Sequence, residues 1–148
     1  MAVNDDALGD LADAVLALSR EIEFRHHDLD FIPLTLNERL ALRVVDRVDE
    51  IAPSELAARV GLQRSNLSTA LRGLETKGLI TREHARGDGR GVVVRSTPLA
   101  AQNLARLRAR WAELLGSVMP AGDLDPVPIA SALDEMSNAL VERRRLEG

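Results

Sequence analysis

The stretch from residue 53 to residue 98 constrains the fold more than any other part of the chain, because its predicted elements follow one another in a specific order. A short predicted helix, PSELAARVG, is followed by the tight turn Gly61-Leu62-Gln63 and a second predicted helix, RSNLSTALRGLETKG. After Gly78, the segment LITREHARGDGRGVVVRSTP predicts two short strands joined by a loop with three glycines and two arginines. This order predicts a winged helix-turn-helix, in which the second helix enters the major groove of DNA and the hairpin contacts the backbone or minor groove.

The charge distribution supports this prediction, although the formal net charge of −4 does not. Residues 1–50 hold five arginines against twelve acidic residues, a net charge of −7. Residues 51–110 hold eleven basic and four acidic residues, a net charge of +7, and residues 111–148 sum to −4. A basic segment between acidic ends is typical of a phosphate-binding module on an acidic body.

Composition excludes several other classes of protein. With 148 residues, we expect a single domain over residues 1–148. The absence of cysteine excludes disulfides, thiolate metal sites and thiol-based peroxide sensing. No apolar run approaches the ~18 residues of a membrane span, so we expect a cytoplasmic protein with no membrane partner. The three aromatic residues (Phe24, Phe31 and Trp111) are too few for a base-stacking platform.

The predicted recognition helix has two distinct faces. Leu67, Leu71 and Leu74 recur at helical spacing and form a predicted core stripe. Small or basic hydrogen-bonding residues lie on another face, at the same spacing: Ser65, Ser68, Thr69 and Arg72. A solvated face would normally mix in glutamates and lysines, whereas small polar side chains allow close approach to a groove, so we favour DNA contact.

Local signals predict the boundaries of the other helices. Thr35 and Glu38 form a capping-box pattern, and we expect the helix that follows to bury Leu40, Val44, Val45 and Val48. Pro53 suits the first turn of the next helix, and Gly61 suits the left-handed position at its end. Thr97 and Asp125 are expected to begin the last two helices.

The terminal helices carry more apolar surface than a small winged helix needs to cover itself. One stripe runs through Leu8, Leu11, Val15, Leu18 and Ile22, and another through Ile129, Leu133, Met136 and Leu140. We therefore predict a homodimer held mainly by residues 5–30 and 98–145, with the DNA-binding winged helix in residues 36–97 and a mainly α fold overall.

On these motifs the chain resembles the MarR family of bacterial transcriptional regulators. The motifs that carry the resemblance are Ser54-Glu55-Leu56-Ala57, Leu74-Glu75 followed by Gly78-Leu79-Ile80 and Arg82, and Asp88-Gly89-Arg90 before Val92-Val93-Val94. The family's wing usually reads Asp-Arg-Arg, so Gly89 stands where the family has an arginine. The resemblance implies that Asp88 orients Arg90 into the minor groove, with Arg86 able to compensate for the missing arginine.

The candidate DNA-contacting residues then come from the recognition helix and the wing. They are Arg64, Ser65, Asn66, Ser68, Thr69, Arg72, Arg86, Asp88 and Arg90. The resulting functional prediction is a DNA-binding regulator, a repressor acting as a homodimer on a near-palindromic duplex site. The alternatives are a winged-helix protein-interaction module with little DNA affinity and a metal-responsive regulator.

The resemblance also implies a small-molecule effector, an apolar or aromatic anion bound between the dimer helices and the winged helix. His26 continues the Leu18–Ile22 stripe by four residues and is the candidate effector contact, with a polar helix end as the more ordinary interpretation. His26, His27, Asp28 and Asp30 form the one metal-like cluster in the sequence, but adjacent histidines on a helix point about 100° apart. We therefore predict no metal and no cofactor, and no catalytic motif favours an enzyme.

Overall fold

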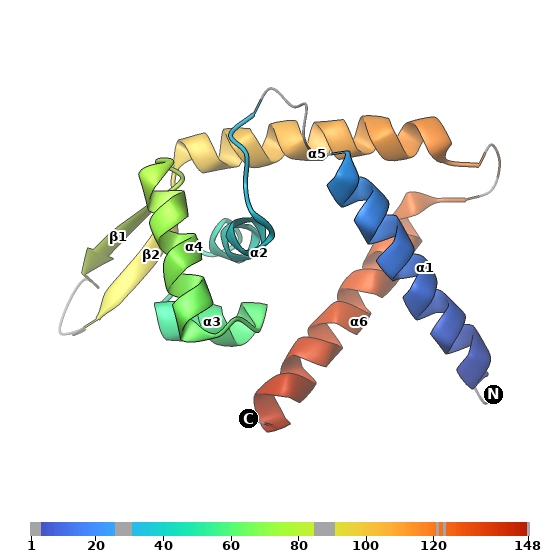
Figure 1. Cartoon of the computed structure of the whole chain (residues 1–148), viewed down its shortest axis with the longest axis horizontal. Helices are drawn as coiled ribbons and strands as arrows, with labels where there is room; N and C mark the ends of the chain where they lie inside the picture. Colours follow the sequence, from blue (N-terminus) through green and yellow to red (C-terminus); the bar gives the residue numbers. More distant parts are fainter. Residues whose placement is uncertain (1–3, 26–30, 85–90, 121, 123, 148) are drawn as a thin grey trace. The chain divides into compact units, whose positions relative to one another are not determined.

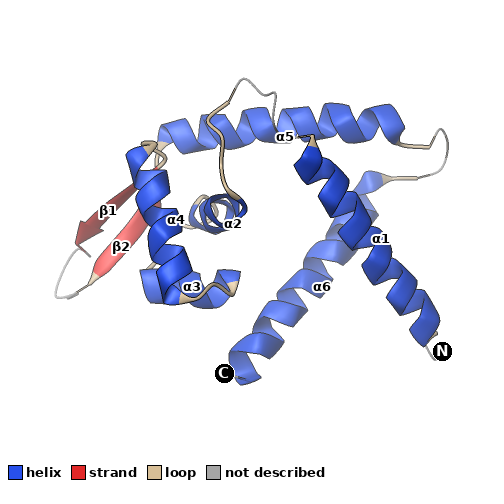
Figure 2. Cartoon of the chain, viewed as in Figure 1, coloured by secondary structure: helices blue, strands red, loops and turns tan. Residues whose placement is uncertain are grey.

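The computed structural model describes residues 4–25, 31–84, 91–120, 122 and 124–147. These residues are mainly helical and include one two-stranded antiparallel sheet, as Figures 1 and 2 show. The predicted fold class is therefore confirmed. The chain divides into two compact units, residues 1–31 and residues 32–148. The single-domain organisation expected from the chain length stays a prediction.

The first unit contains one helix, α1 (Asp5–Phe24), which begins where the Asn4 side chain accepts a hydrogen bond from the backbone of Asp6. The second unit contains α2 (Leu36–Val45), α3 (Pro53–Val60), α4 (Arg64–Thr76), β1 (Ile80–His84), β2 (Val92–Ser96), α5 (Pro98–Val118) and α6 (Pro126–Glu147). Helix α3 begins at a proline and ends at Gly61, whose φ of 69° is left-handed. Both boundary predictions are confirmed.

Helix α2 begins with the predicted capping box. The Thr35 hydroxyl accepts a hydrogen bond from the Glu38 backbone at 3.2 Å, and the Glu38 carboxylate accepts one from the Thr35 backbone at 2.7 Å. That carboxylate is almost fully buried and also accepts a hydrogen bond from Lys77, the only lysine of the chain, at 2.6 Å. Lys77 caps the C-terminus of α4, so one buried carboxylate joins the start of α2 to the end of α4.

The core face of α2 is displaced from the predicted one. Ala41, Leu42 and Val45 are fully buried, whereas Leu40, Val44 and Val48 are only half-buried. Burial of Glu38 and Arg39 explains the difference, because the polar N-terminal turn is itself part of the packed face and rotates the helix relative to the purely apolar stripe. The prediction is therefore confirmed for Val45, while Val44 and Val48 pack against the core but, like Leu40, stay partly buried.

Helix α4 meets the same core through Leu67, Leu71 and Leu74, as predicted, with Ala70 as a fourth buried residue. At its C-terminus the backbone of Gly78 donates to Glu75 and that of Leu79 donates to Leu74, a Schellman arrangement that ends the helix and starts β1. The strands pair antiparallel from Ile80 opposite Ser96 to His84 opposite Val92.

Long-range contacts that the sequence did not reveal complete the second unit. Ile51 adds a single bridge to Val94 on the free side of β2, with backbone hydrogen bonds of 3.1 and 2.8 Å. The buried amide of Asn103, on α5, accepts from the backbone N–H of Ile32 at 2.8 Å and donates to its carbonyl at 3.1 Å. These bonds tie the segment that precedes α2 to α5.

The terminal stripes are largely exposed. On α1, the side chains of Leu8, Leu11, Val15 and Leu18 are between 40% and 50% exposed. Helix α6 begins at the predicted Asp125 cap and exposes Ile129, Met136 and Leu140. Apolar side chains thus remain accessible on both helices.

We predict that Gly73→Ala destabilises the fold although alanine is the better helix former. A Cβ at Gly73 would collide with the buried Glu38 carboxylate and break its bonds to Thr35 and Lys77. The loss should exceed the helix-propensity gain of about 1 kcal/mol and lower the free energy of unfolding by about 1–2 kcal/mol, measured by urea denaturation.

Gly116→Ala on α5 is the matched control, because a Cβ at Gly116 meets nothing within 4 Å. This variant should gain about 0.5–1 kcal/mol. Equal stabilisation by the two substitutions would show that Glu38 is not held in place.

Candidate nucleic-acid interface

The face of α4 that points away from the core carries all six predicted contact residues of this helix. Leu67, Ala70, Leu71 and Leu74 occupy the buried side. The exposed residues are Arg64, Ser65, Asn66, Ser68, Thr69 and Arg72. A core on one side and short polar or basic side chains on the other leave a helix that can approach a groove closely.

Two hydroxyl groups on this helix are already engaged with its backbone. The Thr69 hydroxyl donates to the carbonyl of Ser65 at 3.1 Å, and the Thr76 hydroxyl donates to that of Arg72 at 2.9 Å. Thr69 therefore offers a ligand its methyl group and an oxygen that accepts, which suits an apolar contact with a thymine methyl or a bond from a base amino group.

The N-terminus of α4 has no side-chain cap. Gln63 is the N-cap residue but makes no side-chain capping bond, and the first turn contains no acidic residue. The first backbone N–H groups of a helix lack intrahelical acceptors and lie at the positive end of its dipole. Together with Arg64, this end of the helix has the chemistry that binds a phosphate.

A groove of about 340 Å³ runs beside this end of α4. It is lined by Pro53, Ser54 and Ala57 of α3, by Arg64, Leu67, Ser68 and Leu71 of α4, and by Arg82 of β1. Arg82 belongs to one of the motifs that carry the family resemblance, but the sequence did not predict that it contacts DNA. In the structure it lines this groove together with Arg64 and Ser68. Strand alternation gives no signal for it, because Arg82 lies two residues from the buried Ile80 and residues 81–84 are all exposed.

Ion pairs reduce the positive charge that the basic segment presents. Lys77 is paired with Glu38, Arg82 with Glu75 at 3.3 Å and Arg59 with Glu55 at 2.9 Å. Arg95 is paired with Glu50 and, at 3.7 Å, with Glu83. In contrast, Arg64 and Arg72 have no carboxylate partner among the residues that the structure describes. Among the described residues of this region, Arg64 and Arg72 thus present unpaired positive charge on the exposed side of α4, as Arg106 and Arg108 do on α5.

The predicted wing-tip and effector residues cannot be placed. Arg86, Asp88 and Arg90 lie between β1 and β2, outside the described residues, as do His26, His27, Asp28 and Asp30 between α1 and α2. Their roles stay predictions. Over the described ranges, no three His, Asp or Glu side chains are grouped so that they could hold a metal ion. None of the described helices is both long enough and apolar enough to span a membrane.

Comparisons with known proteins agree with this architecture. Residues 32–91 match the sequence model of the MarR family. No curated protein matches the sequence. Among solved structures, the transcriptional regulator PA3341 is similar, with 27% identity, a TM-score of 0.64, and coverage of 90% of this chain and 96% of that one.

Two further structures share the fold at lower identity. FabT from Streptococcus pneumoniae, solved in complex with DNA, has 21% identity, a TM-score of 0.61 and 96% coverage of both chains. A MarR family protein from Bacillus stearothermophilus has 18% identity, a TM-score of 0.68, and coverage of 94% of this chain and 99% of that one. The sequence match over residues 32–91 and the fold shared along almost the whole chain confirm the resemblance to the MarR family.

Proposed function

We propose that this protein is a transcriptional repressor that binds a near-palindromic duplex DNA site as a homodimer. The observation that carries the proposal is the exposed face of α4, where short polar side chains lie beside the unpaired Arg64 and Arg72 and an open helix N-terminus. Helix α4 would enter the major groove, and the hairpin β1–β2 would contact the adjacent backbone or minor groove. The similarity to FabT, which was solved with DNA, supports this arrangement.

Selection of bound duplexes from a random pool tests the proposal directly. A dimer with two copies of α4 should recover two half-sites about 34–36 Å apart, related by a two-fold axis. A protein-interaction module would enrich no sequence and show no salt-dependent duplex binding. A metal-responsive regulator would bind only after a metal was added.

We predict that Arg72→Ala weakens binding to the selected duplex by about 1–3 kcal/mol, because Arg72 has no carboxylate partner and lies on the exposed face of α4. Fluorescence anisotropy at several salt concentrations measures the loss, and a reduction of the salt slope by about 1 would assign Arg72 to a phosphate. Arg108→Ala, which removes an equally exposed arginine from α5, is the control and should leave the affinity unchanged.

The wing has its own expected signature. Arg90→Ala should weaken all duplexes alike and flatten the salt slope by about 1, whereas Ser68→Ala and Thr69→Ala should relax preference at defined positions. The same anisotropy series checks this difference. Unchanged affinity and slope for Arg90→Ala would remove the wing from the interface.

For the dimer, we propose that the exposed apolar stripes of α1 and α6 pack against a second copy. We predict that Leu11→Asp yields a monomer in analytical ultracentrifugation at micromolar concentration, because a carboxylate would have to be buried in the interface. Leu16 is also an exposed leucine of α1, but it lies five residues along and off the stripe, so Leu16→Asp should remain dimeric. A monomeric wild-type chain would contradict the dimer.

We further propose that an apolar anion releases the DNA. A crevice of about 380 Å³ supports this, because Arg43 and Arg47 of the α2 region and Arg59 of α3 line it with Val44, Ser137, Asn138, Val141, Glu142 and Arg145. Several arginines beside the apolar Val44 and Val141 suit a carboxylate with a small apolar body.

Calorimetry with salicylate, against neutral salicylamide, tests the effector. We expect the acid alone to bind and to lower DNA affinity, and Arg43→Gln with Arg47→Gln to abolish both effects. Binding that leaves DNA affinity unchanged would reject the coupling, and unchanged ligand affinity in His26→Ala would reject His26 as a contact.

A further inference from the structure

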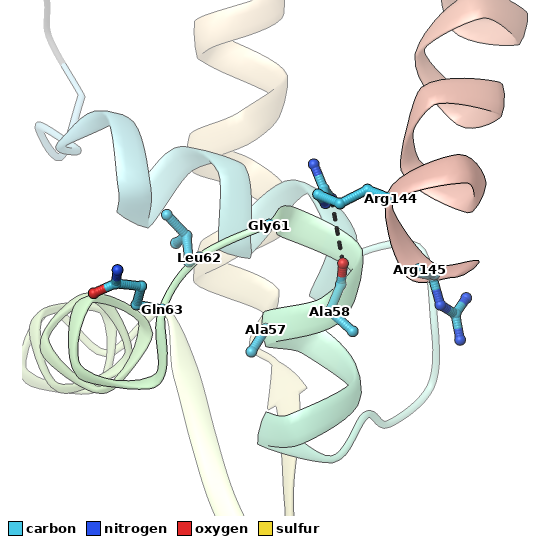
Figure 3. A pocket seen from close by; sticks show the side chains of 7 residues that line it. All are labelled: Ala57, Ala58, Gly61, Leu62, Gln63, Arg144 and Arg145. Atoms are coloured by element: carbon cyan, nitrogen blue, oxygen red, sulfur yellow. Dashed lines mark hydrogen bonds between the residues drawn. The ribbon is translucent and has the colours of Figure 1, made fainter. Parts of the chain in front are cut away.

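The last turn of α6 is hydrogen-bonded to the last turn of α3, as Figure 3 shows. The Arg144 guanidinium donates hydrogen bonds of 3.2 Å to the backbone carbonyls of Ala58 and Arg59. Next to it, Arg145 lies 3.4 Å from the Glu55 carboxylate at the start of α3. Two consecutive arginines of α6 thus bind opposite ends of one short helix.

Arg144 supplies what the end of α3 lacks. A helix leaves its last carbonyls without intrahelical partners, and these carbonyls form the negative end of the helix dipole. The backbone N–H groups of Gly61 and Leu62 both donate to the carbonyl of Ala57. The next two carbonyls, those of Ala58 and Arg59, accept from Arg144, which brings a positive charge to this end of the helix.

Gly61 makes room for this contact. A Cβ at Gly61 would lie 2.5 Å from Cζ and Nη1 of Arg144, so the guanidinium occupies the space that any other side chain would fill. Gly61 also begins the turn that leads through Leu62 to Gln63, the N-cap residue of α4. The arginine therefore sits directly on the turn that sets the direction of α4.

We propose that Arg144 is a positioning residue for DNA reading, which holds the α3–α4 turn and so couples the C-terminal helix to the recognition helix. This inference rests on the proposed DNA-binding function. Helix α6 also carries the exposed Ile129, Met136 and Leu140, which we assign to the second copy. Helix α6 is thereby linked to the N-terminus of α4 through the Arg144 guanidinium, beside the Arg145–Glu55 ion pair that also joins α6 to α3.

Arg143 provides a matched control, because it lies in the same turn of α6 and, among the described residues, its carboxylate partner is Glu147 of its own helix, at 2.9 Å. Arg144→Ala and Arg143→Ala each remove one positive charge from this turn. Arg144→Lys keeps the charge but replaces the planar guanidinium, whose Nη2 donates to both carbonyls, with a compact ammonium on a shorter side chain. Thermal unfolding and sedimentation should match the wild type for all three variants, because Arg144 lies at the surface.

The first measurement needs no DNA. Amide hydrogen exchange at Gly61 and Leu62 should become roughly tenfold faster in Arg144→Ala, because the turn loses its external support, and should stay unchanged in Arg143→Ala. Equal exchange in the two variants would overturn the inference. Partial recovery in Arg144→Lys is the expected intermediate result.

The second measurement compares affinities for the selected duplex and for a scrambled one. We expect Arg144→Ala to lower the ratio of these affinities about tenfold and Arg143→Ala to change it less than twofold. If the wild type discriminates and Arg144→Ala discriminates equally, the positioning role is refuted while DNA binding stands. If the wild type binds no duplex, the proposed function and its dependent reading role both fail, and the exchange rates still decide whether Arg144 holds the turn.

Discussion

The buried carboxylate of Glu38 fixes the arrangement on which the candidate interface depends. It closes the capping box with Thr35 and receives Lys77 at 2.6 Å, and Lys77 also donates to the carbonyl of Pro33 at 2.8 Å. A buried charge is costly unless it is paired and hydrogen-bonded, and here Oε2 of Glu38 accepts from the Thr35 backbone and from the Lys77 ammonium. The bond joins the start of α2 to the end of α4 and so holds in place the helix whose leucine stripe faces the core.

Ion pairs such as Glu38–Lys77 change how the net charge of the basic segment should be interpreted. The net charge of +7 over residues 51–110 indicated a nucleic-acid partner, yet Lys77, Arg82 and Arg95 neutralise carboxylates of the fold itself. What distinguishes the interface is therefore the position of the unpaired Arg64 and Arg72, both on the helix whose N–H groups are open. Arginines at defined positions contribute more to sequence recognition than the net charge of the segment does. Their phosphate contacts fix the register in which the base edges are read.

Local signals account for what could be predicted from the sequence. The capping box at Thr35, Pro53 at the start of α3, Gly61 at its end and the leucine stripe of α4 each depend on residues within a few positions of one another. The contacts that were missed join distant residues: Glu38 and Lys77 are 39 positions apart, and Ile32 and Asn103 are 71 apart. The periodicity of apolar residues along a helix or strand does not reveal contacts between residues so far apart in the sequence. It also misplaced the core face of α2, since an apolar stripe gives no weight to a buried glutamate.

The structure separates a fixed core from surface contacts that can be exchanged. Glu38 is nearly inaccessible, so breaking its bonds should lower the free energy of unfolding by at least about 1–2 kcal/mol, the loss expected for Gly73→Ala. Arg144, by contrast, is exposed, and exposed charged contacts contribute little free energy each. A switch needs two arrangements that differ by only a few kcal/mol, since a ligand can shift an equilibrium by no more than its differential affinity. The exposed Arg144 contact is weak enough to form part of such a switch, and the arginine-lined crevice includes Glu142 and Arg145 from the same turns of α6. The proposed effector and the proposed DNA reading would then be coupled through the surface of α3, while the core that holds α4 stays intact.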